Sequence, residues 1–136
     1  MSNFLQNVIS SLGDDIFLVQ VGANDGVNCD PVHEHYVSNK TWNALLIEPV
    51  CDLYEKLIQN YASQSDRTQF ANVAVGNIDG TQTMYRCAQP AADLGLPSWV
   101  DSCITFDPTC NILSDPRLRD HVEEFTIETR TFDSLL

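Results

Sequence analysis

The sequence has few basic residues and no long apolar run. Its 136 residues contain 7 Lys+Arg against 19 Asp+Glu, a formal net charge of -12, and no Lys or Arg occurs before Lys40. A surface this acidic repels phosphate groups, so we expect no binding to nucleic acid or to an anionic membrane surface. No stretch approaches the roughly 20 apolar residues that a membrane-spanning helix needs.

The cysteine pattern lacks the features of a disulfide framework or a zinc site. Five cysteines are an odd number, and none belongs to a Cys-x-x-Cys pair. Residues 1–6 lack the basic and apolar stretches of a secretory signal, so we expect reduced thiols and a cytoplasmic location. The spacing of Cys29, His33 and His35 matches no common zinc pattern, and the two histidines would lie on different faces of a helix. We therefore expect no metal site.

The length and composition are those of one folded domain. A chain of 136 residues with 43% hydrophobic residues buries enough surface to form a core without disulfides. We therefore expect residues 1–136 to form a single domain.

The first part of the sequence contains patterns of both strands and helices. Residues 16–21 and 44–47 are nearly unbroken apolar runs, which are typical of strands covered on both faces. Apolar residues at helical spacing predict a helix over residues 4–12, with Gly13 as a left-handed cap, and another over residues 50–61.

The order of these patterns predicts a parallel sheet. Asp30 and Pro31 resemble the start of a short helix that runs to about Val37, and residues 69–75 are a third strand candidate. A sequence of strand, helix, strand, helix and strand is the pattern of an α/β fold with crossover connections.

The second part is less regular. Residues 81–86 and 125–129 are predicted strands, and residues 87–111 a long ordered loop. A short helix is expected after Asp115 and Pro116, up to about residue 121. Residues 131–136 look like the beginning of a further helix.

A glycine-containing turn directly after the first apolar run is the clearest functional signal. It consists of Gly22, Ala23, Asn24, Asp25 and Gly26. Glycines at both ends of such a turn allow the backbone to bend tightly and to approach a ligand closely. The G-x-G-x-x-G pattern of dinucleotide binders is absent. Asp25 would repel phosphate oxygens but suits a cationic ligand, unless it caps the following helix instead.

An acidic residue follows the second apolar run. Glu48 precedes Pro49, at the position where Rossmann-like proteins place a carboxylate that accepts both ribose hydroxyls. A positively charged nucleoside without phosphates fits both signals, and S-adenosylmethionine is such a molecule. Asn72 is a candidate for the adenine edge or for a hydrogen bond to its own backbone.

These segments resemble a known enzyme family. Residues 19–26 look like the first motif of the FkbM-type S-adenosylmethionine-dependent methyltransferases, and residues 47–49 look like their second motif. Residues 72–80 are similar to the stretch that follows their third strand. Looser similarity continues through residues 96–99, 105–107 and 131–136.

The resemblance implies a Rossmann-like, three-layer α/β fold and methyl transfer to a hydroxyl of a sugar, lipid or secondary metabolite. It implies S-adenosylmethionine as the cofactor and no particular catalytic residue. The implied cofactor contacts are Gly22, Ala23, Asn24, Asp25, Gly26, Glu48, Pro49 and Asn72.

In that family the segment similar to residues 131–136 leads into a Lys-Ile-Asp-Val-Glu-Gly-like motif, which this sequence does not reach. We therefore expect the N-terminal, cofactor-binding half of a methyltransferase, inactive alone. An unpaired edge of the first strand would favour a homodimer. The alternative is a non-catalytic nucleoside-binding or interaction module. A nicotinamide dehydrogenase is disfavoured by the missing glycine pattern.

Overall fold

The computed structural model describes residues 3–136, which divide into two compact units, one that ends at Ala74 and one over Val75–Leu136. The first unit holds a parallel sheet, and the second sheet contains an antiparallel pair. Mixed α/β content is therefore confirmed. That residues 1–136 form a single domain stays a prediction.

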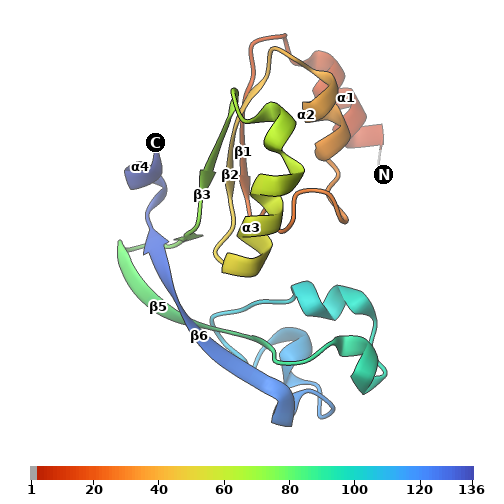
Figure 1. The fold of residues 1–136 in the computed structure, drawn as a ribbon, viewed down its shortest axis with the longest axis vertical. Coiled ribbons are helices and arrows are strands. Elements are labelled where there is room, and N and C mark those ends of the chain that lie inside the picture. The colour runs from red at the N-terminus through yellow and green to blue at the C-terminus, as the bar shows by residue number, and fades with distance from the viewer. Residues whose placement is uncertain (1–2) are drawn as a thin grey trace. The chain divides into compact units, whose positions relative to one another are not determined.

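The sheet of the first unit has β2 at its centre (Figure 1). Its strands are β1 (Phe17–Val21), β2 (Asn43–Ile47) and β3 (Thr68–Ala71), all parallel. The two predicted strands and their parallel arrangement are confirmed. The third strand is shorter than expected, because pairing with β2 ends at Ala71.

Three helices belong to this unit, α1 (Asn3–Ser11), α2 (His33–Ser38) and α3 (Cys51–Asn60). All three were predicted, but Gly13 is not in the left-handed region, so its assignment as a left-handed cap is wrong. The helix start predicted at Asp30 and Pro31 is wrong, because α2 begins at His33 and its N-cap is Val32, which forms no side-chain cap hydrogen bond. Asp30 instead accepts a hydrogen bond from the N–H of Val32 at 2.8 Å, in the turn before the helix.

The core of the first unit lies around β2, whose last four residues are buried. Tyr36 of α2, Leu46 of β2 and Leu57 of α3 are all completely buried in it. The apolar run of β1 predicted a strand covered on both faces, and this prediction is wrong. Phe17 is 52% exposed and Val21 is 55% exposed. Among the described residues β1 pairs only with β2, so it is an edge strand.

Arg67, directly before β3, connects to α2 and to the segment that follows this helix. Its guanidinium donates hydrogen bonds to the carbonyl oxygens of Tyr36 (3.1 Å), Asn39 (3.1 Å) and Trp42 (2.7 Å). It also lies 4.1 Å from the centroid of the Tyr36 ring. A planar group with several donors is suited to hold three carbonyls at once.

The sheet of the second unit has the order β4-β6-β5. Its strands are β4 (Ala74–Val75), β5 (Gly80–Cys87) and β6 (Val122–Arg130), and β5 and β6 are antiparallel. The predicted strands over residues 81–86 and 125–129 are confirmed, and both are longer than predicted.

The segment between β5 and β6 carries short 3-10 helices and a second core. The helices are η2 (Ala91–Leu94), η3 (Ser98–Ser102), η4 (Asn111–Ser114) and η5 (Arg119–His121). The core contains Ala91, Val100, Leu113 and Leu118. The short helix predicted up to about residue 121 is present only as η5, which begins at Arg119, because residues 116–118 form turns. The helix predicted near the end of the sequence is α4 (Phe132–Leu135), and its cap Thr131 accepts from the N–H of Ser134.

Across residues 3–136, no helix is both long and apolar enough to cross a membrane.

Candidate functional site

The glycine-containing turn lies at the carboxyl end of β1, against the end of β2. The N–H groups of Gly22 and Ala23 both donate to the carbonyl oxygen of Ile47, each at 2.9 Å. Gly22, Asn24 and Gly26 all have positive φ, at 73°, 55° and 77°. This run of left-handed residues turns the chain sharply away from the sheet, which explains the glycines at both ends.

The two glycines of the turn face different surroundings. A Cβ on Gly22 would meet no atom within 4 Å, so the space beside it is open. A Cβ on Gly26 would lie 2.5 Å from Cδ1 of Leu57 and would also collide with the ring of Tyr61. Gly26 therefore allows the turn to pack against α3, whereas Gly22 leaves room beside the backbone.

Glu48 connects the turn to the beginning of α3. Its Oε2 accepts a hydrogen bond from the N–H of Asn24 at 2.8 Å, and its Oε1 accepts one from the N–H of Val50 at 3.0 Å. The residue is only 4% exposed. Burial raises the pKa of Glu48 above its ordinary value, and the nearby Asp52 carboxylate acts in the same direction, while the two N–H groups oppose the shift.

The carboxylate of Asp25 accepts hydrogen bonds from the residues that directly follow the turn. Its Oδ1 accepts from the N–H groups of Val27 (3.0 Å) and Asn28 (2.8 Å), and its Oδ2 accepts from the side-chain amide of Asn28. Burial raises the pKa of Asp25, but these hydrogen bonds outweigh burial and lower it overall. The alternative that Asp25 caps the following helix is wrong, because its carboxylate bonds Val27 and Asn28, which precede α2.

Asn72 reaches the connection between β2 and α3 from the residue after β3. Its side-chain amide donates to the carbonyl oxygens of Glu48 (2.9 Å) and Pro49 (3.1 Å), and its Oδ1 accepts from the thiol of Cys51 (3.3 Å). The side chain therefore bonds the backbone of another segment and not its own. The structure thus brings together the three segments that sequence patterns singled out.

His33, considered for a metal site, contacts an aromatic hydroxyl. Its Nδ1 lies 3.0 Å from the hydroxyl oxygen of Tyr61, and the two rings pack edge to face. Within the residues that the structure describes, no three His, Cys, Asp or Glu side chains gather into a group that could hold a metal ion.

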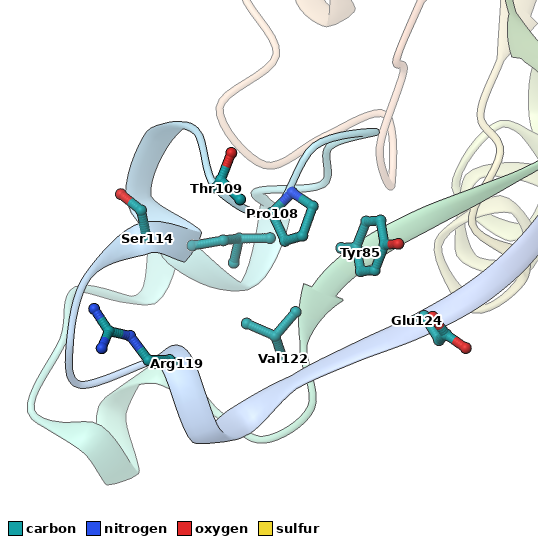
Figure 2. Close-up of a pocket in the computed structure, with 8 residues that line it drawn as sticks. Tyr85, Pro108, Thr109, Ser114, Arg119, Val122 and Glu124 are labelled. Carbon is teal, nitrogen blue, oxygen red and sulfur yellow. The ribbon is translucent and has the colours of Figure 1, made fainter.

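The second unit contains a pocket that the sequence did not predict. It has a volume of about 580 Å³ (Figure 2). Its lining residues are Tyr85, Pro108, Thr109, Leu113, Ser114, Arg119, Val122 and Glu124. They come from β5, β6 and the irregular segment between them, which has no periodic pattern that would predict their meeting.

No protein-family model, no curated protein and no solved structure matches this chain significantly.

Proposed function

We propose that this chain binds S-adenosylmethionine, as the cofactor-binding part of a Rossmann-like methyltransferase of the FkbM type. One observation carries the proposal. The turn after β1 and the acidic residue after β2 are joined by a hydrogen bond at the carboxyl edge of a parallel sheet of order β1-β2-β3. In open α/β sheets, ligands bind in the crevice outside the carboxyl ends of the strands.

The chemistry of Glu48 supports a ribose ligand. Each carboxylate oxygen accepts one backbone N–H and keeps a further lone pair, so both can accept from a ribose hydroxyl. Glu48 is only 4% exposed, so the hydroxyls reach its carboxylate only after a local rearrangement that keeps the hydrogen bond from the N–H of Asn24. The open space beside Gly22 is where the ligand would approach the backbone.

The other predicted contacts take supporting roles in this proposal. Asp25 fixes the turn through its bonds to Val27 and Asn28, and Asn72 fixes the segment that carries Glu48 and Pro49. Within the turn, Ala23 is buried in the core, and the N–H of Asn24 donates to Glu48. Both residues therefore help to hold the turn in place. The cofactor, when bound, supplies a methyl group on a sulfonium.

Methyl transfer to an acceptor hydroxyl requires alignment more than acid–base chemistry. The enzyme has to place the acceptor oxygen in line with the methyl group and exclude water. A general base helps but is not essential, because the leaving group is already activated. The acceptor we propose is a small molecule with a hydroxyl group, and we assign no catalytic residue.

One observation favours a second candidate, a nucleoside-binding module without catalysis. The carboxylate of Asp25 is occupied by the turn, so it does not offer its charge to the ammonium group of the cofactor. A neutral nucleoside needs no such charge.

Calorimetric titration with S-adenosylhomocysteine, adenosine and NAD tests both candidates. We expect S-adenosylhomocysteine to bind most tightly and Glu48→Ala to weaken it at least tenfold, because hydrogen bonds to a charged group contribute ~1.5–3 kcal/mol each. Glu55→Ala, which removes an exposed carboxylate of α3, is the matched control.

The outcomes separate the candidates. Equal affinity for adenosine and S-adenosylhomocysteine supports the module, and tighter binding of NAD contradicts both. Because Glu48→Ala leaves two N–H groups without an acceptor, Gly22→Val serves as a second variant. It should abolish binding, and although a side chain at a φ of 73° is strained and should lower the stability, it enters open space, so the far-UV circular dichroism should stay nearly unchanged.

A further inference from the structure

The pocket of the second unit has the size and lining of a ligand site. Its volume of about 580 Å³ falls within the range of ~300–1,000 Å³ typical of small-molecule pockets. Apolar side chains of Pro108, Leu113 and Val122 form part of its wall, and Leu113 is only 2% exposed. Polar groups at its two ends provide the means to orient a ligand.

Arg119 in this pocket differs from the other four arginines, which all have partners. The partners are Glu123 for Arg86, Asp115 for Arg117, Glu128 for Arg130, and three carbonyl oxygens for Arg67. The guanidinium of Arg119 forms no hydrogen bond or ion pair within the described part of the chain. In a protein with a net charge of -12, an arginine without an acidic partner is unexpected.

The acidic residue of the pocket does not neutralise this arginine. Arg119 and Ser114 lie at one end of the pocket, whereas Tyr85 and Glu124 lie at the other, with Val122 between them (Figure 2). The two charged side chains therefore lie at opposite rims of the pocket, where both are exposed and point outward in Figure 2, with the apolar wall between them. A guanidinium is positively charged at every pH at which proteins are folded, and it binds carboxylate and phosphate groups with two parallel hydrogen bonds.

We propose that this pocket binds a small organic anion with an apolar body, whose carboxylate or phosphate pairs with Arg119 and whose hydroxyl donates to Glu124. A simple cation is disfavoured, because the positive charge of Arg119 lies within the same pocket. The proposal goes beyond cofactor binding, uses none of the residues assigned to it, and needs no cofactor for its test.

The test is a residue-resolved NMR titration of the whole chain. The probes are 4-hydroxycinnamate, its neutral amide 4-hydroxycinnamamide, and inorganic phosphate. We expect 4-hydroxycinnamate to shift the amide signals of Tyr85, Leu113, Arg119 and Val122. The amide should bind about tenfold more weakly, because it loses the charge-assisted hydrogen bonds. Phosphate should bind at Arg119 more weakly than 4-hydroxycinnamate, since it does not cover the apolar wall.

The variants Arg119→Gln and Arg117→Gln form a matched pair. Both residues are exposed, so neither change should unfold the protein, and the dispersion of the NMR signals checks this. Arg119→Gln should weaken 4-hydroxycinnamate about tenfold. Arg117→Gln should not, because Arg117 pairs with Asp115 and does not line the pocket.

Three results would overturn the proposal. They are the absence of shifts at the lining residues with both anions, equal affinity of the carboxylate and its amide, and unchanged affinity in Arg119→Gln. Phosphate binding as tight as that of 4-hydroxycinnamate would overturn the organic ligand, because the apolar wall would then contribute nothing.

Discussion

The backbone N–H of Asn24 donates to the buried carboxylate of Glu48, at 2.8 Å and across 24 positions of the sequence. Each residue follows a parallel strand, and the second oxygen of the carboxylate accepts from Val50 at the beginning of α3. One side chain thus holds the turn after β1 and the connection to α3 in place. A change at Glu48 therefore acts on both segments at once.

The stability of the protein should depend on pH through Glu48. Because burial raises its pKa above the ordinary 4.5, the folded state holds this proton more tightly than the unfolded state. The contribution of Glu48 to the free energy of unfolding therefore falls as pH rises from about 4.5 through the raised pKa. Glu48→Gln cannot titrate, so its unfolding free energy should fall less over this window.

Urea denaturation at a series of pH values measures this difference. Glu55→Gln is the control, since its carboxylate is exposed on α3. Identical pH dependence of the wild type and Glu48→Gln would show that the Glu48 pKa is not raised.

Alanine should be tolerated differently at the two ends of the glycine turn. Both Gly22 and Gly26 have left-handed φ, so alanine at either costs about 1–2 kcal/mol of strain. At Gly26 the new Cβ also collides with Leu57 and Tyr61, which should cost roughly 1–3 kcal/mol more. Equal unfolding free energies of Gly22→Ala and Gly26→Ala would contradict this packing.

Arg67→Lys should destabilise the first unit. Lysine cannot reproduce a planar fork that bonds the carbonyls of Tyr36, Asn39 and Trp42, and a buried acceptor without a donor costs about 1–3 kcal/mol. Arg130→Lys is the matched control. Its exposed pair with Glu128 should contribute less than about 1 kcal/mol. Thermal unfolding of the two variants compares them, and equal midpoints would count against the role of Arg67.

The free edge of β1 should drive self-association. Among the described residues this strand pairs only with β2, and Phe17 at its beginning is half exposed. Such an edge is prone to pair with a second copy of the chain, so we expect a dimer at micromolar concentration in light scattering. Phe17→Lys should shift the equilibrium toward monomer, and Ile78→Lys, at a similarly exposed residue, should not. A monomeric wild type would contradict this expectation.

Sequence patterns predicted those elements whose own residues carry the signal. The apolar run of β2 and the apolar stripe of α3 are local features, and both elements form as expected. The meeting of Glu48 with the glycine turn also followed from topology, because the carboxyl ends of adjacent parallel strands share one edge of the sheet.

Features that depend on neighbours were not predictable. The run of β1 resembles that of β2, yet Phe17 and Val21 are half exposed, because apolar sequence does not specify which elements cover a strand. The carboxylate of Asp25 accepts hydrogen bonds from Val27 and Asn28 in a turn where Asn24 and Gly26 have positive φ. The sequence permits these backbone conformations but does not require them. The pocket around Arg119 joins segments without any common pattern.

The contact of Gly26 with α3 also has an evolutionary consequence. Leu57 and Tyr61 occupy the volume that any side chain at position 26 would need. Homologous chains that lose this glycine should therefore carry smaller side chains at positions 57 or 61, so the three positions should covary. Position 22, which faces open space, should vary independently of positions 57 and 61.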